Sequence, residues 1–137
     1  MGTRSLTVFV EDGKEFAVMY RQMDGYPNGG HGQELAEFLA GRKIVNGISM
    51  ADGPRIANGM GCLAAQVVAH FKDEPGSIYL MAPGTRAVWE EFIYRVSGGA
   101  GDVEANVEVL DGDEKTLFSG PASNVLEWCK KYVEDQA

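Results

Sequence analysis

The stretch from residue 4 to residue 21 reads RSLTVFVEDGKEFAVMYR. On each side of Asp12-Gly13, apolar side chains alternate with their neighbours, which is the period-two pattern of a β-strand. Asp-Gly is a favoured pair for a tight turn between antiparallel strands. The sequence therefore predicts a β-hairpin, and a two-residue turn at Asp12-Gly13 would place Arg4 opposite Arg21.

Two arginines at one end of a hairpin indicate an anion nearby. Like charges that face each other directly destabilise a sheet, so a bound negative group would relieve the repulsion between Arg4 and Arg21. A change of one residue in the loop would instead pair Arg4 with Gln22 and still keep both arginines at the same end. We therefore expect an anion site at this end of the hairpin.

Working outward from the hairpin, periodicity and turn residues predict an order of ββ-α-α-ββββ-α. The expected helices lie near 33–41, 58–71 and 121–133, and the further strands at 77–82, 88–96, 103–109 and 115–118. Residues 44–55 show no clear period and are expected to form a loop or a short strand. A turn at Pro83-Gly84 is expected to join two of the strands. The fold class is α+β, an antiparallel β-sheet with helices packed on it, and residues 1–137 form a single domain.

The helix expected at 58–71 is unusual because it carries almost no charge. Its apolar stripe includes Leu63 and Val67, and its other side carries Gly61, Ala65 and Ala69. A helix that is apolar or small all round is buried on more than one side. It either lies centrally in the domain or is covered by another subunit, so we expect a homo-oligomer.

Charge and cysteine content narrow the possible partners. The formal net charge of −8 repels nucleic-acid polymers and anionic membranes. The longest uncharged run, 56–71, is shorter than the ~20 residues of a membrane helix, and no basic-then-apolar leader begins the sequence. Cys62 and Cys129 match no zinc spacing and are expected to be buried thiols. The sequence thus predicts a cytoplasmic protein with no metal and no cofactor.

The segment after the hairpin, DGYPNGGHG at residues 24–32, is the main functional candidate. Glycines let the backbone approach a ligand, and the first turn of a helix presents free N–H groups to a phosphate or carboxylate. The spacing matches neither a Walker loop nor a dinucleotide fingerprint. The alternative is a plain turn beside arginines that pair with carboxylates of the chain. The predicted ligand-binding residues are Arg4, Tyr20, Arg21, Gln22, Asp24, Tyr26, Gly29, Gly30, His31 and Gly32.

His31 and His70 are the only histidines, and they define the catalytic alternative. A nucleotide hydrolase would use one of them as its base. Cys62, Gln66 and His70 share one helix edge and match a thiol protease in residue type, but side chains stacked on one edge seldom reach catalytic geometry. Gln66 and His70 are expected instead to be hydrogen-bonded core groups or pocket lining, and no catalytic residue is predicted.

Several segments resemble a family of small, largely uncharacterised phage and bacterial proteins. These segments are GTRSLT at 2–7, YRQ at 20–22 with DGYP at 24–27, GHG at 30–32 and NGMGCLA at 58–64. A phage setting implies, by analogy, a protein that sequesters an immune signal such as a cyclic or ADP-ribose-type nucleotide without cleaving it. The predicted function is therefore non-catalytic binding of an anionic, nucleotide-like small molecule. The alternatives are the hydrolase above and a module that binds and inhibits another protein.

Overall fold

The computed structural model describes residues 2–47, 55–98 and 103–133. In chain order, the elements are β1 (Arg4–Glu11), β2 (Lys14–Arg21), α1 (His31–Leu39), β3 (Lys43–Val45), β4 (Ile56–Asn58), α2 (Gly59–Phe71), β5 (Ile78–Met81), β6 (Glu90–Ser97), β7 (Asn106–Asp111), β8 (Thr116–Pro121) and α3 (Ala122–Lys131). The α+β class is confirmed. Two short strands, β3 and β4, are added to the predicted order, and residues 48–54 of the segment left open between 44 and 55 lie outside the described residues.

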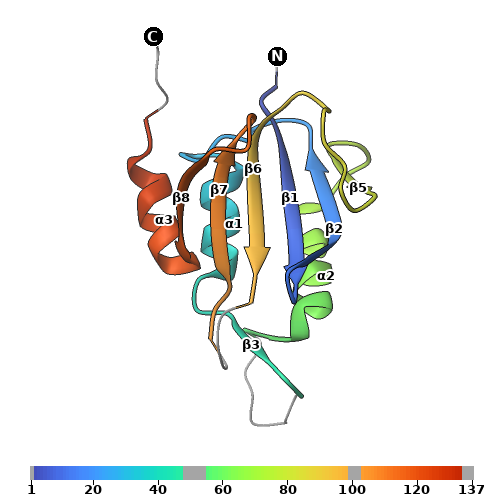
Figure 1. Cartoon of the computed structure of the whole chain (residues 1–137), viewed down its shortest axis with the longest axis vertical. Helices are drawn as coiled ribbons and strands as arrows, with labels where there is room; N and C mark the ends of the chain where they lie inside the picture. The colour runs from blue at the N-terminus through green and yellow to red at the C-terminus, as the bar shows by residue number, and fades with distance from the viewer. Residues whose placement is uncertain (1, 48–54, 99–102, 134–137) are drawn as a thin grey trace.

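The main sheet has six strands in the order β5-β2-β1-β6-β7-β8. It is mixed, because β1 and β6 run parallel while the other neighbours are antiparallel. The prediction of a wholly antiparallel sheet is wrong at this one pair. The reason is that β5 and β6 do not form a hairpin through Pro83-Gly84, since β5 lies at the edge beside β2 and β6 lies beyond β1 (Figure 1).

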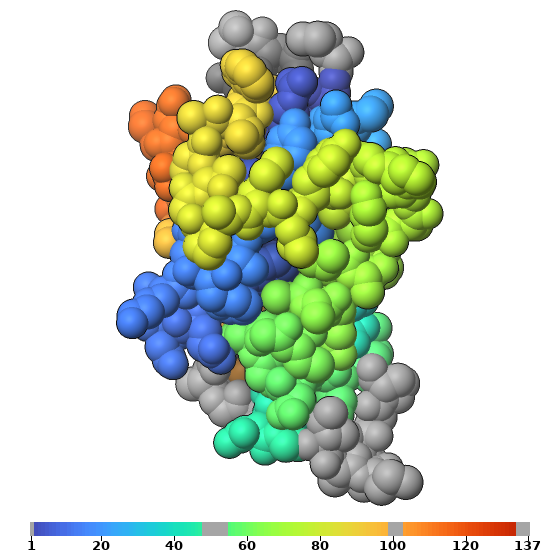
Figure 2. All heavy atoms as spheres, turned by 90° about the vertical axis from the view of Figure 1, so that its right-hand side faces the viewer, coloured from blue at the N-terminus to red at the C-terminus, as the bar shows by residue number. Residues whose placement is uncertain are grey.

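Each face of the sheet has its own apolar cluster. On one face, all three helices pack on Phe9, Met19, Tyr94 and their neighbours (Figure 1). On the other face, a smaller cluster around Leu6 and Val8 is packed against Val88 of the 82–89 connection. Figure 2 shows this connection, in yellow-green to yellow, lying across the blue hairpin strands. Because both faces are covered, the central strand β1 is buried almost throughout.

The connection is also held by charge. Arg86 forms ion pairs with Glu15 of β2 at 2.9 Å and with Glu114 of the β7–β8 turn at 3.5 Å. The hydrogen bond to Glu15 raises the pKa of the Arg86 guanidinium, so Arg86 stays charged although it is partly buried. In the described ranges, no helix has both the length and the apolar character needed to cross a bilayer.

The register of the β1–β2 hairpin corrects the expected arginine pair. Near the turn, Val10 faces Glu15, as a turn at Asp12-Gly13 requires. A bulge between Phe9 and Val10 then shifts the register by one residue, so that Ser5, not Arg4, faces Arg21. Because neighbouring side chains of a strand point to opposite faces, Arg4 and Arg21 lie on opposite faces of the sheet.

Candidate functional site

The glycine-rich loop between β2 and α1 is closed on itself rather than open. The first N–H groups of α1, which an anion would use, already donate within the chain: His31 N to Asp24 O at 2.7 Å, Gly32 N to Tyr26 O at 3.3 Å and Gln33 N to Pro27 O at 2.9 Å. The expected anion site at this helix start is therefore not formed by the backbone.

Three of the loop glycines serve close packing. An added Cβ would approach Ser5 N to 2.9 Å at Gly25, Asp24 O to 2.6 Å at Gly30 and Tyr94 Oη to 2.8 Å at Gly32. Gly29 differs, because its φ of 76° needs glycine and no atom lies near its missing side chain. The glycines therefore let the loop dock on β1 and β6, and Tyr94 secures it by donating a hydrogen bond to Gly25 O at 2.7 Å.

His31 is fully buried and uses both ring nitrogens. Arg21 Nη1 donates to Nδ1 at 3.2 Å, and Nε2 lies 2.6 Å from Thr7 Oγ1. Since arginine can only donate, Nδ1 is the acceptor and the proton sits on Nε2, which donates to Thr7. Burial, with a contribution from Arg21, lowers the pKa of His31 from 6.5 to about 3. His31 is thus a neutral structural group under Arg21 and not an accessible base.

Arg21, one of the predicted ligand-binding residues, is held in place by several contacts. Its side chain is 14% exposed, and it forms an ion pair with Glu34 of α1 at 2.8 Å. Its Nε donates to Met23 O at 2.8 Å, and its guanidinium lies 5.6 Å from the centre of the Phe71 ring. The two N–H groups of Nη2 have no hydrogen-bond partner among the described residues. The alternative expectation, an arginine that pairs with a carboxylate of the chain, is therefore met by Glu34. This pairing uses Nη1 and leaves Nη2 unpaired among the described residues.

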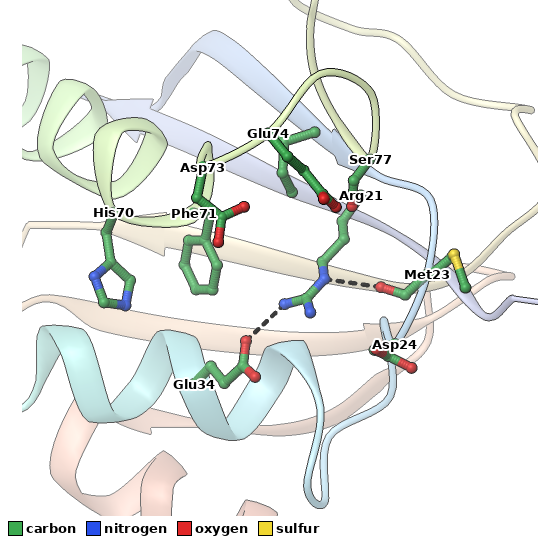
Figure 3. Close-up of a pocket in the computed structure, with 10 residues that line it drawn as sticks. Arg21, Met23, Asp24, Glu34, His70, Phe71, Asp73, Glu74 and Ser77 are labelled. Carbon is green, nitrogen blue, oxygen red and sulfur yellow. Dashed lines mark hydrogen bonds and ion pairs between the residues drawn. The ribbon is translucent and has the colours of Figure 1, made fainter.

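Arg21 lines a pocket of about 520 Å³ between α1, the end of α2 and the start of β5 (Figure 3). Aromatic rings of His70 and Phe71 form one side of this pocket, which we call the Arg21 pocket. The same lining carries four carboxylates, from Asp24, Glu34, Asp73 and Glu74. A single guanidinium thus stands among several acids, which is a more acidic site than the sequence predicted.

Of the other predicted ligand-binding residues, Asp24 lines this pocket, and the rest are not in its lining. Arg4 Nε donates to Tyr20 Oη at 2.9 Å, and the Arg4 guanidinium lies 5.9 Å from the Trp89 ring, on the face away from the helices. Gln22 is exposed, and its backbone N–H donates to Ser77 O. Tyr26 donates to Asp24 at 3.2 Å. The fold thus divides the predicted set between the two faces of the sheet.

Sequence reasoning missed the contribution of Asp73 and Glu74. They lie just beyond α2, after Lys72, and more than fifty residues from Arg21 in the chain, yet both line its pocket. The only local signal was an acidic pair before Pro75-Gly76, which looks like an ordinary helix end. His70, expected as a core group or pocket lining, does line the pocket.

The remaining reactive side chains are separately engaged. Gln66 donates to Ile56 O at 2.9 Å, and His70 stacks on Phe38 with ring centres 4.5 Å apart. Cys129 is buried, as expected, and burial raises its thiol pKa to about 12, whereas Cys62 is only partly buried. In the part of the chain that the structure describes, no three His, Cys, Asp or Glu side chains group to hold a metal ion.

Comparisons with protein-family models, curated proteins and solved structures give no match. The resemblance to phage proteins therefore stays a prediction from the sequence. Any function has to be argued from the residues of the Arg21 pocket.

Proposed function

We propose that the protein binds a small nucleotide-like molecule in the Arg21 pocket without cleaving it. The observation that carries this proposal is the state of Arg21 Nη2. Its two N–H groups have no partner among the described residues, although the side chain is only 14% exposed. Nη2 can be reached from the pocket, and the protein itself does not use its two N–H groups, so they can donate to an acceptor on a ligand. A phosphate oxygen is such an acceptor for an arginine fork.

The shape of the pocket is consistent with a ligand of this size. Its volume of about 520 Å³ lies within the usual range for small-molecule sites. Phe71 and His70 contribute aromatic surface to the lining, with Phe38 stacked on one face of His70, and aromatic surface of this kind favours contact with a base. The two free thiols are consistent with a reducing compartment, and the proposal places the protein in the cytoplasm.

A ligand panel tests the proposal. Cyclic dinucleotides, ADP-ribose isomers and simple polyanions are added to the protein, and the melting temperature is recorded for each. A ligand at 100 times its Kd should stabilise the native state by about 2.7 kcal/mol. Arg21→Lys keeps the charge but loses the fork, and should weaken the binding of that ligand roughly 10-fold or more.

Arg4→Lys is the matched control, because Arg4 lies on the other face of the sheet and should not affect binding. If no member of the panel raises the melting temperature, or if both lysine variants weaken binding equally, the Arg21 pocket is not the site.

Hydrolysis is the second candidate, and only His70 supports it, because this histidine lines the pocket and is exposed. Incubation with each binding nucleotide, followed by chromatography, separates the candidates. If the wild type releases product and His70→Gln does not, the protein is a hydrolase and the proposal of binding without cleavage is wrong.

We also propose that a second copy of the chain covers α2. Gly61, Ala65 and Ala69 line an apolar groove of about 650 Å³, and Leu80 of the edge strand β5 stands beside it with 67% of its surface exposed. The groove and the projecting leucine on one surface favour a self-complementary contact.

Ala65→Glu tests this contact, because a charge in the groove would have to be buried between subunits. We expect light scattering after size exclusion to show an oligomer for the wild type and a monomer for Ala65→Glu. Asn124→Glu, at an exposed position of α3, should leave the mass unchanged. A monomeric wild-type protein would exclude the contact.

A further inference from the structure

The 82–89 connection joins two parallel strands without a helix. β5 lies antiparallel to β2, β2 lies antiparallel to β1, and β1 runs parallel to β6, so β5 and β6 point in the same direction. A link between parallel strands has to return along the sheet, and it usually contains a helix of its own. Here residues 82–89 alone make that return, across the face of the sheet away from the helices (Figure 2).

The 82–89 connection is longer than its route requires. Met81 pairs with Val18, which in turn faces Val8 of β1. Glu90 faces Arg4, four positions before Val8 in the same strand. With three strand spacings between β5 and β6, the two ends lie about 20 Å apart, whereas the extended chain between them reaches about 30 Å. The connection can therefore lift from the sheet while both strands stay paired.

The contacts that hold the connection down are mainly polar. None of its eight residues is buried, and Val88 is the one that packs against the apolar cluster below. Arg86 Nη2 donates to Glu15 Oε1 at 2.9 Å, and Arg86 Nε lies 3.5 Å from Glu114. The Glu15 carboxylate also accepts from Gly84 N. We call the Arg86–Glu15 ion pair the latch.

The surface beneath the connection is apolar and dry. Leu6, Val8 and Val18 each have none of their surface exposed, although all three helices pack on the other face of the sheet. The connection is what covers them on this face. A cover held mainly by polar contacts belongs to the least stable part of a domain, which can open before the rest unfolds.

Two strained residues lie in the second half of the connection. Ala87 and Trp89 have φ values of 61° and 63°, in the left-handed region that residues other than glycine seldom adopt. The Glu90 carboxylate holds this conformation by accepting from Ala87 N at 3.2 Å and from Val88 N at 2.9 Å. Strain of this kind is released when the backbone moves, and its release offsets part of the cost of exposing the apolar surface.

We propose that the 82–89 connection opens as a unit and uncovers the second apolar face of the sheet while the rest of the domain stays folded. The latch sets how often it opens, so one ion pair controls access to Leu6, Val8 and Val18. This device is independent of the Arg21 pocket, which lies among α1, the end of α2 and the start of β5.

Thiol labelling of two cysteine variants tests the proposal. Val8→Cys places a thiol under the connection, and Val96→Cys places one on the helix side of β6; both valines are fully buried. Iodoacetamide is added under native conditions, and peptide mass spectrometry separates modification of the new thiol from that of Cys62 and Cys129. Val8→Cys should react roughly 10-fold or more faster than Val96→Cys, because opening costs less than unfolding. Val18→Cys is a second probe under the connection.

Urea separates opening from unfolding, because the slope with urea grows with the surface that is exposed. At low urea, the labelling rate of Val8→Cys should rise only slightly, whereas that of Val96→Cys should rise steeply. Arg86→Met removes the latch and should raise the Val8→Cys rate roughly 10-fold without steepening its slope. Lys130→Met is the control, because Lys130 pairs with Glu127 on the surface of α3, and it should leave that rate unchanged.

Two results would overturn the proposal. If thiols on both faces react equally slowly and with the same steep dependence on urea, only unfolding of the whole domain exposes the second face. If Arg86→Met leaves the Val8→Cys rate as it is in the wild-type background, the ion pair is not the latch.

Discussion

Acidification from pH 7 to pH 4.5 is expected to lower the free energy of unfolding by roughly 2–3 kcal/mol through His31 alone. The folded-state pKa of His31 is lowered to about 3, against an ordinary value of 6.5. Between pH 6.5 and pH 3, His31 binds a proton in the unfolded chain but not in the folded chain. The stabilisation is therefore complete above pH 6.5 and is lost as the pH falls towards 3.

Urea unfolding at a series of pH values measures this loss. His31→Gln should be less stable at pH 7, because Thr7 and Arg21 lose their buried partner, and its stability should change less between pH 7 and pH 4.5. Val67→Ala is the control, because it removes buried apolar contacts and no titratable group, and it should lower the stability while keeping the wild-type pH dependence. An equal slope in His31→Gln and the wild type would show that His31 is not the group responsible.

Gly32→Ala is expected to destabilise the protein by about 3 kcal/mol, which corresponds to a fall of roughly 10 °C in melting temperature. The new methyl group would lie 2.8 Å from Pro27 Cα and 2.8 Å from the Tyr94 hydroxyl. Pro27 is backbone of the closed loop and Tyr94 is fully buried, so neither can move aside easily.

Thermal unfolding followed by circular dichroism measures this effect. Gly120→Ala is the control, because an added Cβ at Gly120 would meet its nearest neighbour, Asn124 Cβ, at 3.7 Å, an ordinary van der Waals distance. That variant should keep the stability of the wild type to within about 1 kcal/mol. A Gly32→Ala protein as stable as the wild type would mean that the loop does not pack on Tyr94.

Local pattern was enough to predict the hairpin and the three long helical segments. It failed where one residue changed the geometry. The alternation of apolar residues does not reveal the bulge at Phe9/Val10. That bulge places Ser5, and not Arg4, opposite Arg21 in the hairpin. Pro-Gly pairs such as Pro83-Gly84 occur both in hairpin turns and in longer connections. The sequence therefore could not predict that β5 lies beside β2.

The candidate site was predicted in part, for a related reason. Arg21 was identified because its surroundings in the sequence are distinctive. The loop glycines were expected to face a ligand, whereas Gly25, Gly30 and Gly32 face the protein, and the choice depends on a contact with Tyr94 far along the chain. Asp73 and Glu74 come to Arg21 only through the pairing of β5 with β2, which a local reading does not contain.

The position of β1 has a consequence for biosynthesis. β1 leaves the ribosome well before β6, one of its two neighbours, because paired residues such as Val8 and Arg95 are 87 positions apart in the chain. Until then the hairpin exposes one open edge and both apolar faces, a state prone to aggregation. The native sheet therefore cannot close around β1 until β6 has been made, and a chaperone that covers the new hairpin before then would limit aggregation.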